Sequence, residues 1–235
     1  MALILNIETS TRVCSVSLAR NGELISLKES RDEKSHATLL TLFIEEVLSS
    51  GKCEISELDA VAVSRGPGSY TGLRIGVSIA KGIVYGSGCK LLGINTLQAM
   101  ASGVASKSFP SGHSGNVLLC PMIDARRMEV FMAIYTHDIR SFRDISAEII
   151  HSGSFSDILS EYQIWFFGDG AGKCRNVINH HNAIFLNDIE PSAASMIALS
   201  EKAFQEQKFE DIAYFEPYYL KDFIATIPGK NVFPG

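Results

Sequence analysis

The stretch from residue 60 to residue 86, AVAVSRGPGSYTGLRIGVSIAKGIVYG, constrains the fold more than any other part of this 235-residue chain. It opens with four small apolar residues, Ala60 to Val63, a run of strand length. Residues 65–69 then interrupt the run with two glycines and a proline, which are typical of a tight turn. From about Tyr70 onward, apolar residues recur among small ones over a segment long enough for about four helical turns. The stretch predicts a strand, a turn and a helix.

Gly72, Gly76 and Ala80 recur at every fourth position of the predicted helix, so they form one smooth stripe along a single face. Each glycine inside a helix costs about 1 kcal/mol relative to alanine, and close packing of another backbone against the stripe would offset that cost. Two explanations remain open at this point. The stripe packs inside the chain's own core, or it lies on a surface helix that docks a partner helix.

A glycine-rich turn between a strand and a helix can also bind a phosphate through its backbone N–H groups. The residues here fit neither standard motif. A P-loop requires lysine and a hydroxyl residue after its last glycine, whereas Gly72 is followed by Leu73 and Arg74. A dinucleotide-binding loop requires glycine where Thr71 stands. The turn therefore carries no standard nucleotide signature.

The charge and the cysteines exclude several classes of function. A net charge of −5 argues against a protein that grips an RNA backbone directly, because such proteins carry a basic surface. The five cysteines include no C-x-x-C pair, which argues against a disulfide framework and against a zinc site. No apolar run approaches the roughly 18 residues of a membrane helix, and the opening MALILNIETS lacks the basic start of a signal peptide. We therefore expect a cytoplasmic protein.

The first half opens with three short strands, predicted at 3–8, 13–18 and 24–27, and Asn21-Gly22 between the last two is a strong hairpin signal. A helix follows, with Ser35 as its N-cap, and it ends at Gly51, which suits the left-handed C′ position of a helix end. Its apolar face is wide, which is typical of a core helix and also fits a shared partner-binding face beside the Gly72–Gly76 helix. The apolar positions are His36, Leu39, Leu40, Phe43, Ile44, Val47 and Leu48.

The second half repeats this order of elements. Residues 106–115 are rich in serine, glycine and proline and are the best candidate for a linker. Beyond them we expect three strands, then alternating helices and strands, with a late helix over 191–207. The repetition predicts an α/β protein with a duplicated unit, in two lobes of residues 1–105 and 106–235. Actin-like and sugar-kinase-like proteins have this two-lobed architecture.

The stretch SRGPGSYTGLRIGVSIAKG, from Ser64 to Gly82, closely resembles the signature of the TsaB (YeaZ) family. Further matches lie in PMIDARRMEVF, EPYYL and IPGK, so the resemblance covers essentially the whole chain. It implies the actin-like (ASKHA) fold and a non-catalytic subunit that binds and stabilises the catalytic subunit TsaD in tRNA threonylcarbamoyladenosine synthesis. It also implies that the ATPase TsaE joins the assembly and that tRNA is contacted only indirectly. Within PMIDARRMEVF, Asp124, Arg126 and Glu129 predict a hairpin turn with an internal salt bridge.

Two places qualify as nucleotide contacts. Active proteins of this fold handle phosphate with an acidic residue and hydroxyls in the first hairpin, where this chain has Glu8, Thr9 and Ser10 and thus glutamate in place of the expected aspartate. The second place, GDGAGKC from residue 168 to 174, is one residue too short for a P-loop and ends in cysteine. We expect no required cofactor, with ATP or ADP as the nucleotide for a cleft or interface. The alternative function is a nucleotide-dependent kinase or ATPase acting alone. The candidate contacts are Thr9, Ser10, Gly168 and Gly170.

No catalytic residue or metal ligand is predicted. The chain has no H-E-x-x-H motif and no G-x-S-x-G elbow. TsaD carries a His-x-x-x-His metal motif in its first lobe, and the comparable residues here, 95–100, include no histidine. This difference argues against a metal site and against the peptidase label attached to relatives.

The partner surface is predicted on the two helices around residues 36–47 and 71–85. The wide apolar face of the first and the small stripe of the second would together bind TsaD, and the same face would form a homodimer where TsaD is absent. The predicted contact residues are His36, Leu39, Leu40, Phe43, Val47, Arg65, Tyr70, Thr71, Gly72, Arg74, Ile75, Gly76, Ile79 and Ala80.

Overall fold

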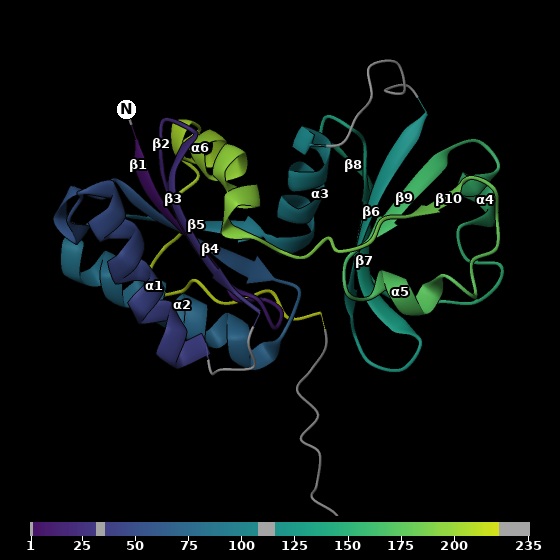
Figure 1. The fold of residues 1–235 in the computed structure, drawn as a ribbon, viewed down its shortest axis with the longest axis horizontal. Coiled ribbons are helices and arrows are strands. Elements are labelled where there is room, and N and C mark those ends of the chain that lie inside the picture. Colours follow the sequence, from purple (N-terminus) through teal and green to yellow (C-terminus); the bar gives the residue numbers. More distant parts are fainter. Residues whose placement is uncertain (1, 32–35, 108–115, 221–235) are drawn as a thin grey trace, which may run out of the picture.

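Two five-stranded sheets form the centres of two lobes in the computed structural model, which describes residues 2–31, 36–107 and 116–220 (Figure 1). The first sheet has the order β3-β2-β1-β4-β5 and the second the order β10-β9-β6-β7-β8. The strands of the first are β1 (Leu3–Glu8), β2 (Cys14–Arg20), β3 (Glu23–Ser30), β4 (Ala60–Gly66) and β5 (Lys90–Asn95). Those of the second are β6 (Val117–Asp124), β7 (Glu129–Tyr135), β8 (Ser141–Ile149), β9 (Gln163–Phe167) and β10 (Ala183–Phe185).

Both sheets are built in the same way. The first three strands of each lobe form an antiparallel meander, and two further strands then add in parallel beside the first one. Parallel neighbours require crossover connections, which the intervening helices provide. The predicted duplicated α/β unit and its actin-like fold class are confirmed.

The helices of the two lobes differ in length. In the first lobe, α1 (His36–Gly51) and α2 (Tyr70–Ser87) lie side by side over the outer face of the sheet (Figure 1). In the second lobe the corresponding helices, α4 (Ser156–Leu159) and α5 (Ala171–Cys174), have four residues each. The remaining helical segments are η1 (Ile55–Glu57), α3 (Thr96–Lys107), η2 (Ala193–Met196) and α6 (Ile197–Gln205).

The space between the sheets is filled by α3, η2 and α6. Leu97 and Met100 of α3 pack with Leu119 and other residues of the second sheet. Met196 of η2 packs against Ile4 and its neighbours in the first sheet, and α6 extends the same cluster. The last helical segment of each half therefore covers the sheet of the other half. The division at residue 105 stays a prediction, to which the structure adds this exchange of helices.

Of the two predicted turn positions that the structure describes, one is confirmed in full and the other only in part. Asn21 and Gly22 both adopt the left-handed backbone of the predicted hairpin, with φ of 52° and 78°. The predicted end of α1 at Gly51 is confirmed, but the left-handed C′ role predicted for Gly51 is wrong, because Lys52 is the left-handed residue there, with φ of 53°. A Cβ atom at Gly51 would lie 2.6 Å from Leu18, so this glycine serves close packing instead. The predicted N-cap Ser35, linker residues 108–115 and residues 227–230 lie outside the described residues.

Candidate functional site

The turn that follows β4 packs against the loop between β1 and β2. Ser69 caps α2, since its side chain accepts a hydrogen bond from the Gly72 amide at 3.3 Å. The Ser69 amide in turn donates to the carbonyl of Ser10 at 2.6 Å. Thr9 completes the contact, because its hydroxyl donates to the Gly72 carbonyl at 2.8 Å. The signature turn and the start of α2 are thus fixed to the first hairpin of the same chain.

This contact explains the small stripe of α2. A methyl group at Gly72 would overlap the Thr9 carbonyl oxygen, and one at Gly76 would overlap the Thr9 hydroxyl. Ala80, the third member, is completely buried in the core of the first lobe. Of the two explanations for the stripe, packing within the chain accounts for all three residues.

The other predicted contact residues divide by burial. Leu40, Phe43 and Val47 of α1 are buried in the same core as Ala80. The His36 ring is half-buried and lies 2.7 Å from the Thr11 carbonyl oxygen. Partner contact stays a prediction for the residues that remain half-buried or exposed, which are His36, Leu39, Arg65, Tyr70, Thr71, Arg74, Ile75 and Ile79.

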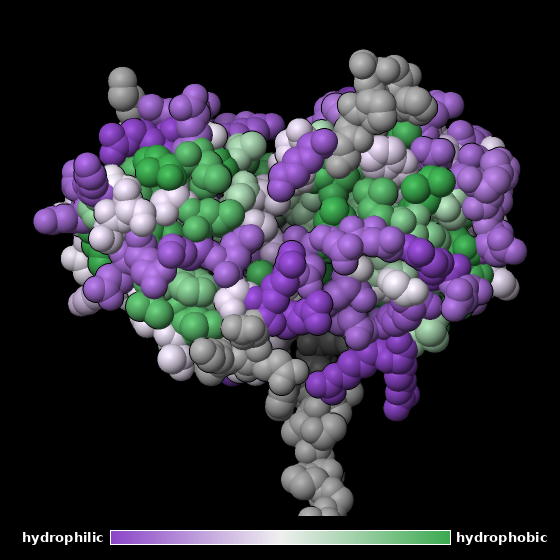
Figure 2. Space-filling model, in the orientation of Figure 1, coloured by the Kyte–Doolittle hydropathy of each residue, from purple (hydrophilic) through white to green (hydrophobic). Residues whose placement is uncertain are grey.

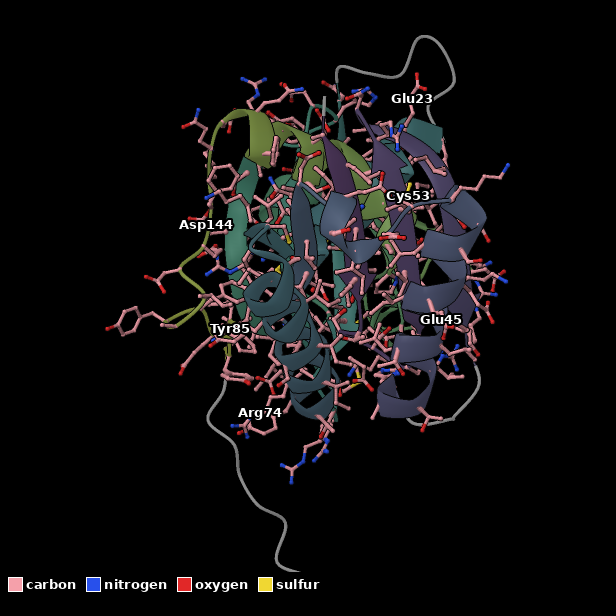
Figure 3. All side chains as sticks on the ribbon, turned by 90° about the vertical axis from the view of Figure 1, so that its left-hand side faces the viewer. Glu23, Glu45, Cys53, Arg74, Tyr85 and Asp144 are labelled. Carbon is pink, nitrogen blue, oxygen red and sulfur yellow. The ribbon has the colours of Figure 1, made fainter. Side chains whose placement is uncertain are left out.

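A second small stripe lies on the outer face of α2, and the sequence prediction missed it. Ser78, Gly82 and Gly86 recur at every fourth position and are exposed. An added Cβ atom at Gly82 or Gly86 would have no atom within 4 Å. Tyr85 beside them is 86% exposed, and Figure 3 places it with Arg74 on this side of the lobe. The spacing that revealed the inner stripe also runs through these residues, so the signal was present.

Two tyrosines near the end of the described chain join the start of α2. The Tyr218 amide donates to the Arg65 carbonyl at 2.6 Å, and the Tyr219 ring lies 4.9 Å from that of Tyr70. The Tyr70 hydroxyl accepts a hydrogen bond from Arg74 at 2.7 Å. In the sequence, Tyr218 and Tyr219 belong only to the family match EPYYL, since spacing does not indicate that residue 219 returns to residue 70.

The four candidate nucleotide contacts lie in two separate places. Thr9 and Ser10 are fully buried against α2. A methyl group at Gly168 would overlap the Met122 carbonyl oxygen, and one at Gly170 would lie 2.8 Å from the carbonyl carbon of the next residue of β6. These glycines therefore permit close packing on β6. A cavity of about 440 Å³ is lined by Gly168 but not by the hydroxyl residues of the first hairpin.

Glu8 lies directly under the Thr9 contact and is completely enclosed. Desolvation raises the pKa of its carboxyl, and hydrogen bonds from Ser10 oppose that effect only in part. One carboxyl oxygen accepts from the Ser10 amide at 2.6 Å. The other has no hydrogen-bond partner among the described residues. The place expected to handle phosphate is thus filled by this chain's own residues.

The predicted salt bridge within the β6–β7 hairpin is wrong in its partner. Asp124 pairs with Lys173 of α5, while the Arg126 backbone amide donates to the Asp124 carboxylate at 2.9 Å. Partial burial raises the pKa of Asp124, but the hydrogen bonds from Lys173 and Arg126 outweigh it and hold that pKa below its ordinary value. The neighbouring Asp169 accepts from the Asp124 amide at 3.0 Å, and burial raises the pKa of Asp169.

Within residues 2–31, 36–107 and 116–220, no cluster of three or more histidine, cysteine, aspartate or glutamate side chains is arranged to hold a metal ion. None of the helices in these same ranges is both long and apolar enough to cross a membrane.

Comparison with known proteins places the chain in a family. Residues 29–229 match the family model described as TsaD, tRNA N6-adenosine threonylcarbamoyltransferase. The tRNA threonylcarbamoyladenosine biosynthesis protein TsaB of Escherichia coli K12 is 29% identical over 97% of this chain and 99% of its own length. TsaB of Haemophilus influenzae is 27% identical over 97% and 98%.

A solved structure supports the fold. A Pseudomonas aeruginosa crystal structure, of an uncharacterized protein with similarity to peptidase YeaZ, superimposes with a TM-score of 0.82 at 22% identity, over 94% of this chain and 100% of that one. The names of the TsaB relatives indicate involvement of these proteins in tRNA threonylcarbamoyladenosine biosynthesis. The chain belongs to the TsaB (YeaZ) family.

Proposed function

We propose that this chain is a non-catalytic subunit that binds and stabilises a TsaD-type catalytic subunit. That subunit would transfer the threonylcarbamoyl group to the adenosine beside the tRNA anticodon, and a TsaE-type ATPase would join the assembly. In the absence of the catalytic subunit, the surface that binds it would instead form a homodimer.

The observation that carries the proposal is the outer face of α2. Gly82 and Gly86 each cost about 1 kcal/mol of helix stability relative to alanine, and the described part of the chain places no atom against them. Close approach of a partner helix would use the missing Cβ atoms. The same two helices also expose apolar side chains: Tyr85 of α2 is 86% exposed, Leu42 of α1 is 46% exposed, and Ile79 of α2 is half-buried. Exposed apolar side chains of this kind are typical of a protein contact.

The first hairpin supports a role without chemistry of its own. Thr9 and Ser10 are fully buried, the Thr9 hydroxyl donates to the Gly72 carbonyl of α2, and the Ser10 carbonyl accepts from the amide of the N-cap Ser69. A phosphate at this hairpin would have to displace the start of α2. The hairpin where related folds bind phosphate therefore stabilises the first lobe here. Its contacts also fix α2, whose outer face then stays in one position for a partner.

A second candidate function is a nucleotide-dependent ATPase of the chain alone. It is favoured by the cavity of about 440 Å³ beside the glycine-rich loop, where Arg175, Phe185 and Asp188 contribute to the lining. Turnover of Mg-ATP by the isolated chain would support this candidate over the first.

Two glycine variants separate the candidates. Gly82 and Gly172 both have open space where a Cβ atom would be added, but Gly82 lies on the outer face of α2 and Gly172 lines the cavity. We expect Gly82→Leu to weaken the complex with the catalytic subunit at least tenfold, or about 1.4 kcal/mol, and Gly172→Leu to leave it unchanged. Light scattering after size exclusion, on the chain alone and mixed with its TsaD counterpart, measures this. Equal affinity of both variants would contradict the proposed face.

A further inference from the structure

Two hairpin turns of this chain share a backbone conformation but not a residue type. Asn21 and Gly22, between β2 and β3, have φ of 52° and 78°. Arg126 and Arg127, between β6 and β7, have φ of 71° and 51°. Asparagine and glycine adopt this left-handed conformation readily, whereas for arginine it is unfavourable. The second turn therefore uses two residues that weaken it.

The arginine turn is held in place by contacts from outside. The Lys173 ammonium group donates to the carbonyls of Arg127 and Glu129, both at 2.7 Å, and pairs with Asp124. The Ala125 amide donates to the Glu129 carbonyl at 3.1 Å. These bonds involve backbone atoms or residues other than the arginines' side chains. The hydrogen bonds of the turn therefore do not use the two guanidinium groups, although the charge of Arg126 attracts the Asp124 carboxylate.

Both guanidinium groups are available to a ligand. Arg126 and Arg127 are exposed, and no acidic side chain of the described residues lies within ion-pair distance of either. The acidic group closest in sequence, Asp124, is already bound by Lys173. Backbone strain that is held by the surrounding structure is a feature of ligand clamps. Here the two residues in the unfavourable backbone conformation are adjacent arginines at the tip of a hairpin.

Charged side chains of both signs lie around the tip, with Asp124 and Asp169 at its base. Across the junction of the lobes, Arg12 and Arg31 share the single carboxylate of Glu190, at 2.7 and 2.6 Å. Figure 2 shows hydrophilic side chains gathered where the lobes meet and along the lower edge of the second lobe. One exposed apolar side chain lies near the tip, since Ile149 of β8 is 70% exposed and pairs with Glu129 in the β7–β8 register. Arg126 and Arg127 lie outside that pair, and adjacent guanidinium groups suit phosphate oxygens.

We propose that the β6–β7 tip binds the phosphate backbone of tRNA through Arg126 and Arg127. Guanidinium groups form paired hydrogen bonds to phosphate oxygens. The inference rests on the proposed function, in which the assembly acts on tRNA. The net charge of −5 argues against an RNA-binding surface over the whole chain. The proposal limits the RNA contact to one tip, where two arginine side chains lie together.

The test exchanges the two turns. Arg126→Asn combined with Arg127→Gly gives the second hairpin the residues of the first and removes both guanidinium groups. We expect this double variant to melt a few degrees higher, because the new residues suit the left-handed backbone. We expect its complex with the catalytic subunit to bind an unmodified tRNA transcript at least tenfold more weakly. The slope of log affinity against log salt should become less steep by about two.

A charge-matched control separates the tip from general electrostatics. Arg140→Gln combined with Lys208→Gln also removes two positive charges, at exposed side chains that are ion-paired with Asp138 and Glu206. This control should keep the wild-type affinity for tRNA and the wild-type salt slope. The Arg126→Lys and Arg127→Lys pair retains the charges and should retain most of the slope.

Each remaining outcome overturns the inference. A lower melting temperature of the exchanged variant would mean that the arginines stabilise the turn. Unchanged tRNA affinity would exclude the phosphate contact, and loss of catalytic-subunit binding without tRNA would assign the tip to an acidic protein surface. If the wild-type chain forms no complex with the catalytic subunit, the proposed function fails by itself. The same titration with the full chain alone then still tests the tip.

Discussion

The inner and outer faces of α2 carry the same pattern and meet different surroundings. On the inner face, Gly72 and Gly76 make room for the backbone and hydroxyl of Thr9. On the outer face, Gly82 and Gly86 have no described neighbour within 4 Å of an added Cβ atom. A small residue at every fourth position therefore indicates a close approach or an open face, and only the fold distinguishes the two.

The difference also assigns separate roles to the two faces. The inner stripe closes the first hairpin over the fully buried Glu8 and fixes the start of α2. The outer stripe contributes nothing to the described fold and reduces helix stability. We infer that the inner face preserves the lobe and that the outer face serves association, which the following substitutions test from opposite sides.

The largest effect is expected on the inner face. Gly72→Ala would place a methyl group on the Thr9 carbonyl oxygen and 3.2 Å from the His36 ring. Because one of these contacts is with backbone, the start of α2 or the first hairpin must shift. We expect a loss of about 3 kcal/mol in the free energy of unfolding, measured by urea titration. Gly172→Ala, which adds a methyl group in open space, is the control, and equal stability of the two variants would disprove the packing role.

A pH-dependent effect is expected from the carboxyl below this contact. Burial raises the pKa of Glu8 in the folded chain above its ordinary 4.5, so folding favours the protonated form. That contribution to stability is complete below pH 4.5 and is lost as the pH rises through the raised pKa of the folded chain. Glu8→Gln keeps an acceptor for the Ser10 amide and removes the ionisation. Its stability relative to wild type should therefore increase with pH above 4.5.

The control for the Glu8 variant is the same substitution at an exposed carboxylate. Glu45 of α1 lies at the surface (Figure 3), and Glu45→Gln changes a group that water already solvates. Thermal unfolding of both variants between pH 4 and pH 8 gives the two profiles. A parallel pair of profiles would mean that Glu8 is hydrated, contrary to its complete burial.

Sequence reasoning succeeded where the signal was local. The strand, turn and helix of residues 60–86 and the Asn21-Gly22 hairpin were predicted because periodicity and turn chemistry act over a few residues. It failed for contacts across the chain. The Gly72 stripe is filled by Thr9, 63 positions away, and Asp124 pairs with Lys173, 49 positions away. Spacing identifies which residues leave room, but the topology of the sheet decides what occupies it.

The smallest effect has the opposite sign and lies on the outer face. Gly82→Ala adds a methyl group that has no atom of the described residues within 4 Å. Alanine also has a higher helix propensity than glycine. We expect the free energy of unfolding of the isolated chain to rise by about 1 kcal/mol, measured by the same urea titration as Gly72→Ala. The gain should come with weaker binding to the catalytic subunit, because the added methyl group holds the partner helix further away. A stabilised chain with unchanged affinity would mean that the outer stripe has no role in association. The two faces of α2 would then not have the separate roles inferred above.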